Sequence, residues 1–172
     1  MSQTLARPEA QLAASIEAAG IGGFDALLVL GSGLGAFGDN LEDARAVGFD
    51  KLAGMPRSAV PGHAGRFVRG KVGSAEVLIQ QGRVHLYEGW SAEEATRSVR
   101  AAALVGARVL LLTNAAGGLR TEWPVPSLMQ LDDHLNLTGR TPLRPGEGGL
   151  GSPYCPRLAA ALQEAAKATG VD

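Results

Sequence analysis

The chain has 172 residues, of which 45% are hydrophobic and 19% are charged, and this balance excludes an intrinsically disordered protein. The formal net charge of −1 argues against a protein that binds nucleic acid through a basic surface, but it is compatible with a site for a small anion. A single cysteine, Cys155, excludes an internal disulfide framework, and the 3 histidines are too scattered to predict a metal site.

Neither a leader peptide nor a membrane-spanning segment is expected. The amino-terminal residues contain charged side chains and lack the apolar run of a signal peptide. The longest apolar stretches, such as residues 109–112, are far too short to cross a bilayer. We therefore expect a cytoplasmic protein that contacts neither membranes nor nucleic acid.

The first half of the chain is predicted to hold one helix and several strands. Leu12 and Ile16 recur at helical spacing within residues 8–19, and Gly20 ends this amphipathic helix. Apolar or alternating runs predict strands at residues 25–30, 44–49, 66–70 and 76–81. The last two strands are close enough along the chain to form a hairpin.

The second half begins with the clearest helix signal in the chain. Ser91 and Glu94 form a capping box, and an alanine-rich run continues the helix to Leu104, before Gly106 ends it. Further along, the sequence predicts a buried strand at 108–113, an extended segment at 128–137, a loop at 138–156 and a helix at 157–169.

This order of elements predicts an α/β fold. Strands alternate with helices, and two apolar strands each run into a turn of small residues, which is typical of a sheet with its ligand site at the carboxyl ends of the strands. The hairpin adds antiparallel pairing, so we expect a mixed central β-sheet flanked by helices. No internal repeat or linker is evident, and residues 1–172 are predicted to form a single domain.

The first small-residue turn is a candidate anion site. Gly31-Ser32-Gly33-Leu34-Gly35 offers one hydroxyl among open backbone N–H groups, which suits a tetrahedral oxyanion such as phosphate. Two other interpretations remain open. The turn could require glycine for its conformation alone, or it could belong to a dinucleotide-binding unit in which Asp50 contacts a ribose.

A second candidate segment is Gly82-Arg83-Val84-His85-Leu86-Tyr87-Glu88-Gly89. Residues two apart share one face of a strand, so Arg83, His85 and Tyr87 are expected to point the same way. Arginine offers a bidentate fork to phosphate oxygens, and histidine can add a donor. A solvated edge strand would show the same alternation, and only the choice of these residue types favours a site.

Two further segments have both a functional and a purely structural interpretation. His63 stands in the glycine-flanked loop 61–65 and is either a mobile gate or a surface residue. Residues 114–118, Asn-Ala-Ala-Gly-Gly, carry no ionisable side chain, so they offer backbone N–H groups and clearance for a flat ligand, or simply a tight turn.

Taken together, five segments resemble motifs of the trimeric-type purine nucleoside phosphorylases, in the order that this family has them. These segments are residues 31–35, 56–65, 81–89, 113–119 and 133–139. The related methylthioadenosine phosphorylases differ around the Arg-His segment and remain an alternative. The resemblance implies a pentosyltransferase of nucleoside metabolism and purine salvage. Such an enzyme reversibly cleaves purine (deoxy)ribonucleosides with phosphate to free base and (deoxy)ribose 1-phosphate, as a homotrimer without metal or organic cofactor.

The resemblance also implies roles for individual residues. The implied phosphate ligands are Ser32, His63, Arg83, His85 and the backbone of Ala115, with Arg83 and His85 as the catalytic pair. His63 would lie in a loop that closes over the phosphate. The nucleoside would be contacted by Tyr87, Ala115, Ala116 and Gly117.

The chain also departs from the family pattern. The later part of the family sequence, which supplies a Glu and an Asn for the purine ring, has no counterpart here, so the carboxyl-terminal part of the family fold is expected to be missing. Residues 146–155 are shorter than in the family and lack a Phe that reaches a neighbouring subunit. We therefore expect mainly the phosphate and ribose half of a site. The chain could be a fragment of an active enzyme, a chain completed by another, or a non-catalytic phosphate- or nucleoside-binding module.

Overall fold

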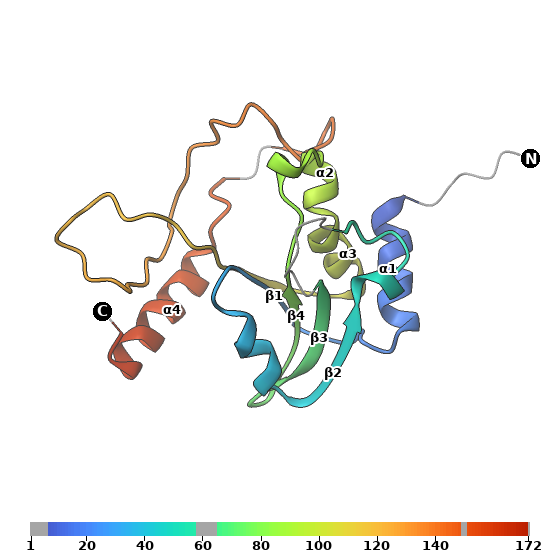
Figure 1. Ribbon diagram of the computed structural model, residues 1–172, viewed down its shortest axis with the longest axis horizontal. Coiled ribbons are helices and arrows are strands. Elements are labelled where there is room, and N and C mark those ends of the chain that lie inside the picture. Colours follow the sequence, from blue (N-terminus) through green and yellow to red (C-terminus); the bar gives the residue numbers. More distant parts are fainter. Residues whose placement is uncertain (1–6, 58–64, 149–150, 172) are drawn as a thin grey trace, which may run out of the picture. The chain divides into compact units, whose positions relative to one another are not determined.

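The computed structural model describes residues 7–57, 65–148 and 151–171 (Figure 1). The chain forms two compact units, Met1–Ala115 and Ala116–Asp172. Each unit is described by itself, and the single domain expected over residues 1–172 stays a prediction.

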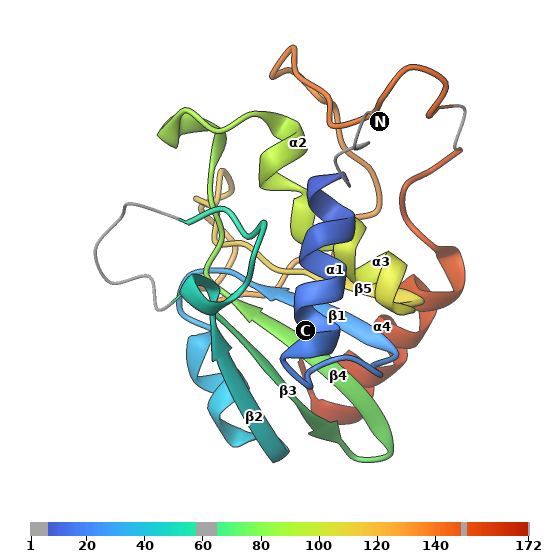
Figure 2. The same cartoon turned by 90° about the vertical axis from the view of Figure 1, so that its right-hand side faces the viewer.

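The first unit is built on a five-stranded mixed sheet, whose strand order is β2-β3-β4-β1-β5 (Figure 2). The strands are β1 (Ala26–Leu30), β2 (Glu42–Gly48), β3 (Arg66–Val72), β4 (Ala75–Gln81) and β5 (Val109–Leu112). Strand β1 is parallel to both β4 and β5, whereas β2, β3 and β4 pair antiparallel. The predicted hairpin and the mixed sheet are therefore confirmed.

Two helices cover one face of this sheet because their apolar stripes meet alternate residues of the strands. Helices α1 (Pro8–Ala18) and α3 (Arg97–Val105) pack against each other and against the strands. The centre of this core is fully buried and contains Leu12, Ile16, Phe67, Leu78 and Ala101. Burying each large apolar side chain contributes about 1.5–3 kcal/mol, so this layer holds the strands in register.

The opposite face of the sheet has a smaller apolar cluster. It contains Leu30, Val68, Val77 and Ile79, with Leu41 packed against them. The segment that follows β1 forms a short 3-10 helix, η1 (Gly35–Asn40), which contacts β4 on its way to β2. Strand residues that alternate with those of the main core therefore point toward η1. Only the side chains of β4 on this face can reach the segment that follows β1.

The predicted helix at 91–104 is two helices, α2 (Ala92–Ala95) and α3. The predicted capping box is present, since Ser91 Oγ accepts from the Glu94 N–H at 3.2 Å and Glu94 Oε2 accepts from the Ser91 N–H at 3.0 Å. The break lies at Thr96, whose hydroxyl donates to the carbonyl of Ala92 at 2.9 Å. Such back-bonding by threonine bends helices, which explains the interruption.

The predicted strand at residues 82–89 is wrong, and the segment predicted to be extended at 128–137 pairs with no strand. Strand β4 ends at Gln81, and residues 86–88 form a 3-10 turn, η3 (Leu86–Glu88), so the segment 82–89 is not a strand. In the second unit the predicted terminal helix is confirmed as α4 (Pro156–Thr169). Among the residues that the structure describes, no helix has both the length and the apolar composition needed to span a bilayer.

Candidate functional site

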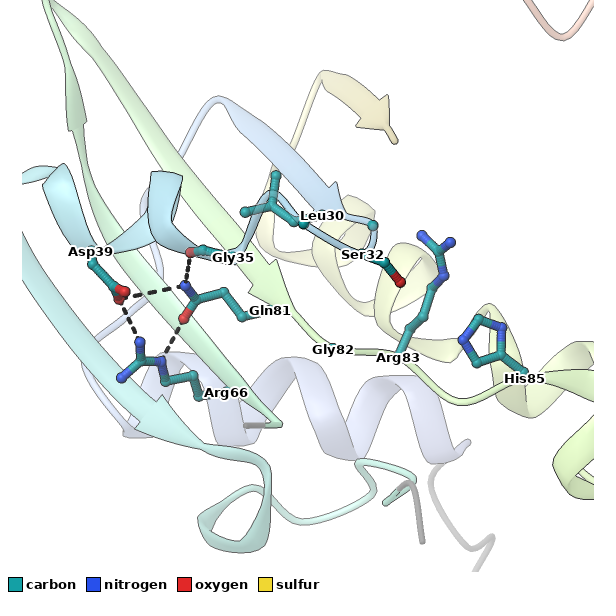
Figure 3. A pocket seen from close by; sticks show the side chains of 11 residues that line it. Leu30, Ser32, Gly35, Asp39, Arg66, Gln81, Gly82, Arg83 and His85 are labelled. Carbon is teal, nitrogen blue, oxygen red and sulfur yellow. Dashed lines mark hydrogen bonds and ion pairs between the residues drawn. The ribbon is translucent and has the colours of Figure 1, made fainter. Parts of the chain in front are cut away.

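A pocket of about 340 Å³ opens in the first unit, where β1 and β4 end (Figure 3). These two strands are parallel with Leu30 beside Gln81, so Gly31 and Gly82 leave the sheet side by side. The turn after β1 and the segment after β4 provide most of the pocket wall, and Asp39 and Arg66 complete it. The pocket therefore lies at the carboxyl edge of the sheet, where the α/β pattern predicts a ligand site.

Three of the predicted site residues line this pocket together. Ser32 comes from the turn after β1, while Arg83 and His85 come from the segment after β4. Figure 3 shows the hydroxyl, the guanidinium and the imidazole following one another along the pocket. A neutral donor, a fixed cation and a titratable donor thus share one concavity, which is the arrangement that a small oxyanion requires.

The end of β5 holds these two segments in place. Arg83 donates to the carbonyl oxygen of Thr113 at 2.8 Å, and the Gly31 N–H donates to the Thr113 hydroxyl at 2.7 Å. Strand β5 is parallel to β1, and the Thr113 N–H continues the ladder by donating to Val29 at 3.0 Å. Thr113 therefore ties together the chain segments that leave three neighbouring strands.

The glycine at position 31 is explained by the close approach of two backbones. A Cβ atom there would lie 2.7 Å from the Thr113 carbonyl oxygen and 2.8 Å from Asn114 Cα. Gly33 has a φ of 87°, a conformation that side chains other than glycine rarely adopt. Both glycines meet needs of the turn itself, and Ser32 between them supplies the functional group.

The predicted row of Arg83, His85 and Tyr87 on one strand face is wrong, because the chain leaves β4 at Gln81. The Glu88 carboxylate accepts from the His85 backbone N–H at 2.9 Å and closes the turn η3. Tyr87 is 78% exposed and stacks on the His85 ring with centroids 4.8 Å apart. It does not line the pocket, and its predicted contact with a nucleoside stays a prediction.

No role in the pocket is established for the other predicted residues, Ala115, Ala116, Gly117 and His63. Ala115 follows Thr113 closely but is exposed and absent from the lining. Ala116 and Gly117 belong to the second unit and are exposed. His63 lies outside the described residues. The roles expected for these four residues stay predictions.

Three polar lining residues were not among the predicted site residues: Asp39, Arg66 and Gln81. Arg66 Nε donates to Gln81 Oε1 at 2.5 Å, and the second guanidinium nitrogen lies 2.5 Å from Asp39 Oδ1. Arg66 and Gln81 are paired residues at the open end of the hairpin. Two long polar side chains at facing positions of an otherwise apolar hairpin are a signal that could have found them, whereas Asp39 gives no such signal.

The dinucleotide interpretation does not fit this geometry. That motif needs an α-helix whose amino end faces the glycine turn, but the turn here runs into the 3-10 helix η1. Asp50 lies in another 3-10 turn, η2 (Phe49–Lys51), and is not part of the pocket lining. Within the described part of the chain, no group of at least three His, Cys, Asp or Glu side chains could hold a metal ion.

Comparison with known proteins gives concordant matches. The family model described as "Phosphorylase superfamily" matches residues 25–172. Purine nucleoside phosphorylase 1 of Bacillus subtilis (strain 168) is 41% identical over 128 residues, which is 74% of this chain and 47% of the relative. Purine nucleoside phosphorylase of Mycobacterium tuberculosis (strain ATCC 25618 / H37Rv) is 42% identical over 162 residues, which is 90% of this chain and 58% of the relative.

The solved structures agree with these matches. Isoform 2 of purine nucleoside phosphorylase from Schistosoma mansoni, in complex with cytosine and ribose-1-phosphate, superimposes with a TM-score of 0.60 and 34% sequence identity. This match covers 66% of this chain and 40% of that one. The chain spans about half the length of the curated relatives that it matches, with coverages from 42% to 58%.

Proposed function

The chain belongs to the phosphorylase superfamily, and we propose that the protein is a purine nucleoside phosphorylase in which this chain supplies the phosphate and ribose half of the active site. The observation that carries the proposal is the convergence of Ser32, Arg83 and His85 on one pocket at the carboxyl edge of the sheet. The substrates would be purine (deoxy)ribonucleosides and inorganic phosphate. The products would be free base and (deoxy)ribose 1-phosphate.

The chemistry available in the pocket supports this reaction. Heterolysis of the glycosidic C–N bond leaves a ribosyl group with oxocarbenium character, as in glycoside hydrolysis. A phosphate oxygen would form the new bond to the anomeric carbon, while the electron pair of the broken bond and a proton go to the purine nitrogen. Arg83, Ser32 and His85 would hold the phosphate on the ribose side, so their part in catalysis is placement and electrostatic stabilisation.

The size of the pocket is consistent with more than an isolated anion. Its volume of about 340 Å³ lies at the lower end of small-molecule sites, which span about 300–1,000 Å³. We propose that Tyr87 and the segment Ala115–Gly117 contact the nucleoside, and that His63 closes over the phosphate.

Several properties of the whole protein are part of the same proposal. We propose a cytoplasmic homotrimer that acts in purine salvage, with inorganic phosphate as co-substrate and no metal or organic cofactor. The relatives named as purine nucleoside phosphorylases support the reaction class, the oligomer is implied by the family resemblance, and the compartment is the expectation drawn from the sequence composition.

The test combines phosphate titration with an assay of inosine or guanosine plus phosphate, in which ribose 1-phosphate is followed. Arg83→Ala removes a cation that faces the anion, and such truncations cost about 2–4 kcal/mol, or roughly 30- to 700-fold in phosphate affinity. The matched control is Arg108→Ala, because Arg108 lies in a solvent-exposed ion pair with Asp25.

The control variant should bind phosphate like the unaltered protein. Unchanged phosphate affinity in Arg83→Ala would remove Arg83 from the site. Phosphate binding without turnover would identify a non-catalytic binding module. Tight binding of NAD that phosphate does not affect would contradict the proposed function.

A further inference from the structure

A chain of polar contacts runs along the pocket wall and ends at the turn that carries Ser32. Asp39 pairs with Arg66, and Arg66 Nε donates to Gln81 Oε1 at 2.5 Å. The Gln81 amide nitrogen donates to the carbonyl oxygen of Gly35, which closes the turn (Figure 3). None of these groups is among the ligands assigned to phosphate above, so the contacts call for a separate explanation.

The orientation of the Gln81 amide is determined by its neighbours. A guanidinium has donors only, so the amide oxygen must face Arg66. The amide nitrogen must then face the Gly35 carbonyl, with Asp39 Oδ1 at 3.5 Å as a second acceptor. Gln81 itself is only 6% exposed, so this arrangement is screened from competing water.

The turn 31–35 is therefore anchored at both ends. Its first residue donates to the Thr113 hydroxyl at 2.7 Å, and its last residue accepts from Gln81. Gly33 and Leu34 lie between these anchors, and Leu34 is 43% exposed, so packing restrains the middle of the turn little. The two anchors rather than burial must define where the Ser32 hydroxyl lies.

We propose that Gln81 is a positioning residue, oriented by Arg66 and Asp39, that clamps the turn 31–35 and thereby fixes Ser32 for anion binding. The statement that the anion is phosphate rests on the proposed function. The proposal also accounts for the carboxylate of Asp39, which by itself would repel an anion in the pocket. Arg66 offsets the charge of Asp39 while the pair serves to orient the amide.

The test uses Gln81→Met, a neutral side chain of similar length that can neither donate to Gly35 nor accept from Arg66. The matched control is Asn40→Leu, because Asn40 also donates from a side-chain amide to a backbone carbonyl, that of Ala36 at 3.1 Å, but outside the pocket lining. Thermal unfolding verifies that each variant is folded.

The first measurement is amide hydrogen exchange at Leu34 in phosphate-free protein, because the Leu34 N–H donates to Gly31 within the turn at 3.3 Å. We expect exchange to accelerate about fivefold or more in Gln81→Met and to stay unchanged in Asn40→Leu. Equal exchange in all three proteins would overturn the clamp, whether or not the protein binds phosphate.

The second measurement is a double-mutant cycle for phosphate affinity with Ser32→Ala. If Gln81 acts through Ser32, Gln81→Met should weaken binding about tenfold in the unaltered background and less than about twofold in the Ser32→Ala background. Equal losses in both backgrounds would mean that Gln81 does not act by positioning Ser32. Absence of phosphate binding in the unaltered protein would refute the proposed function instead. Hydrogen exchange alone would then show whether Gln81 holds the turn 31–35 in place.

Discussion

The two ends of the central sheet use arginine differently. At the amino edge of β1 and β4, Arg69 pairs with Glu76 at 3.0 Å and Arg108 pairs with Asp25 at 2.8 Å. At the carboxyl edge, Arg66 also pairs with Asp39, whereas Arg83 donates to a backbone carbonyl and, in the part of the chain that the structure describes, forms no ion pair. The ion pairs neutralise charge, whereas Arg83 keeps its positive charge beside the pocket, which supports the carboxyl edge as the proposed functional end.

The largest effect is expected from Phe67→Ala, which should destabilise the sheet as a whole and therefore both of its edges. Phe67 is fully buried at the centre of the core, in ring contact with Phe49 at a centroid distance of 5.0 Å. Phe67→Ala should lower the free energy of unfolding by about 3–5 kcal/mol, because truncation of a buried aromatic leaves a cavity. Denaturant unfolding measures this loss. A loss below about 1 kcal/mol would contradict the assigned core.

Gly31→Ala should have a smaller effect, one that distinguishes the carboxyl edge of the sheet from the amino edge. Gly31→Ala places a methyl group against the backbone of Thr113, and such overpacking costs about 1–3 kcal/mol. Gly22→Ala at the amino edge is the matched change, since its Cβ would meet Glu17 and Val105 at an ordinary 3.5 Å. We expect phosphate affinity to fall in the first variant alone. Equal behaviour of the two variants would contradict the close approach at Gly31.

The smallest effect concerns the helix that follows the pocket segment. The Ser91 N–H and hydroxyl donate to Glu94 and hold the pKa of Glu94 below its ordinary value. Because the folded-state pKa is lowered, this contribution to stability is present above about pH 4.5 and is lost as pH falls through the lowered pKa. Ser91→Ala should cost about 1 kcal/mol near neutral pH and less in acid, as thermal unfolding at several pH values would show.

An ion pair at the amino edge of the sheet is the comparison for the lowered pKa of Glu94. Lys71 likewise lowers the pKa of Asp43, but both side chains are exposed and the pair is screened by salt. We expect Lys71→Met to bring the pKa of Asp43 back toward its ordinary value without a measurable change in Tm. A change in Tm comparable to that of Ser91→Ala would contradict the view that the Lys71–Asp43 pair adds little to stability.

Much of the sheet could be predicted because its signals are local. The apolar stripe of α1, the short apolar strands and the hairpin around Gly73 all follow from side-chain periodicity and turn residues. The predicted strand at residues 82–89 failed for a physical reason. The alternation of residues 82–89 resembles a strand, but Gly82 has a φ of 91° and turns the chain away from β4.

The site itself could be predicted only in part. Residue chemistry pointed to Ser32, Arg83 and His85 because a hydroxyl, a guanidinium and an imidazole have few common roles together. Gln81 could not be recognised as a clamp, because its partner Gly35 is reached only when β4 lies beside β1 in the observed register. The break at Thr96 was missed because one threonine in an alanine-rich run gives no local sign that its hydroxyl will bond to the Ala92 carbonyl.

The parallel register of β1 and β4 limits how this chain can tolerate length changes. Gln80 and Gln81 are adjacent amides on opposite faces, and Gln80 donates to Gly82 at 2.9 Å instead of reaching the pocket. An insertion of one residue inside β4 would exchange these two faces and point the wrong amide at Gly35. At the hairpin tip, a Cβ on Gly73 would meet no atom within 4 Å. Insertions should therefore accumulate at that tip, while the number of residues from Ala75 to Arg83 stays constant.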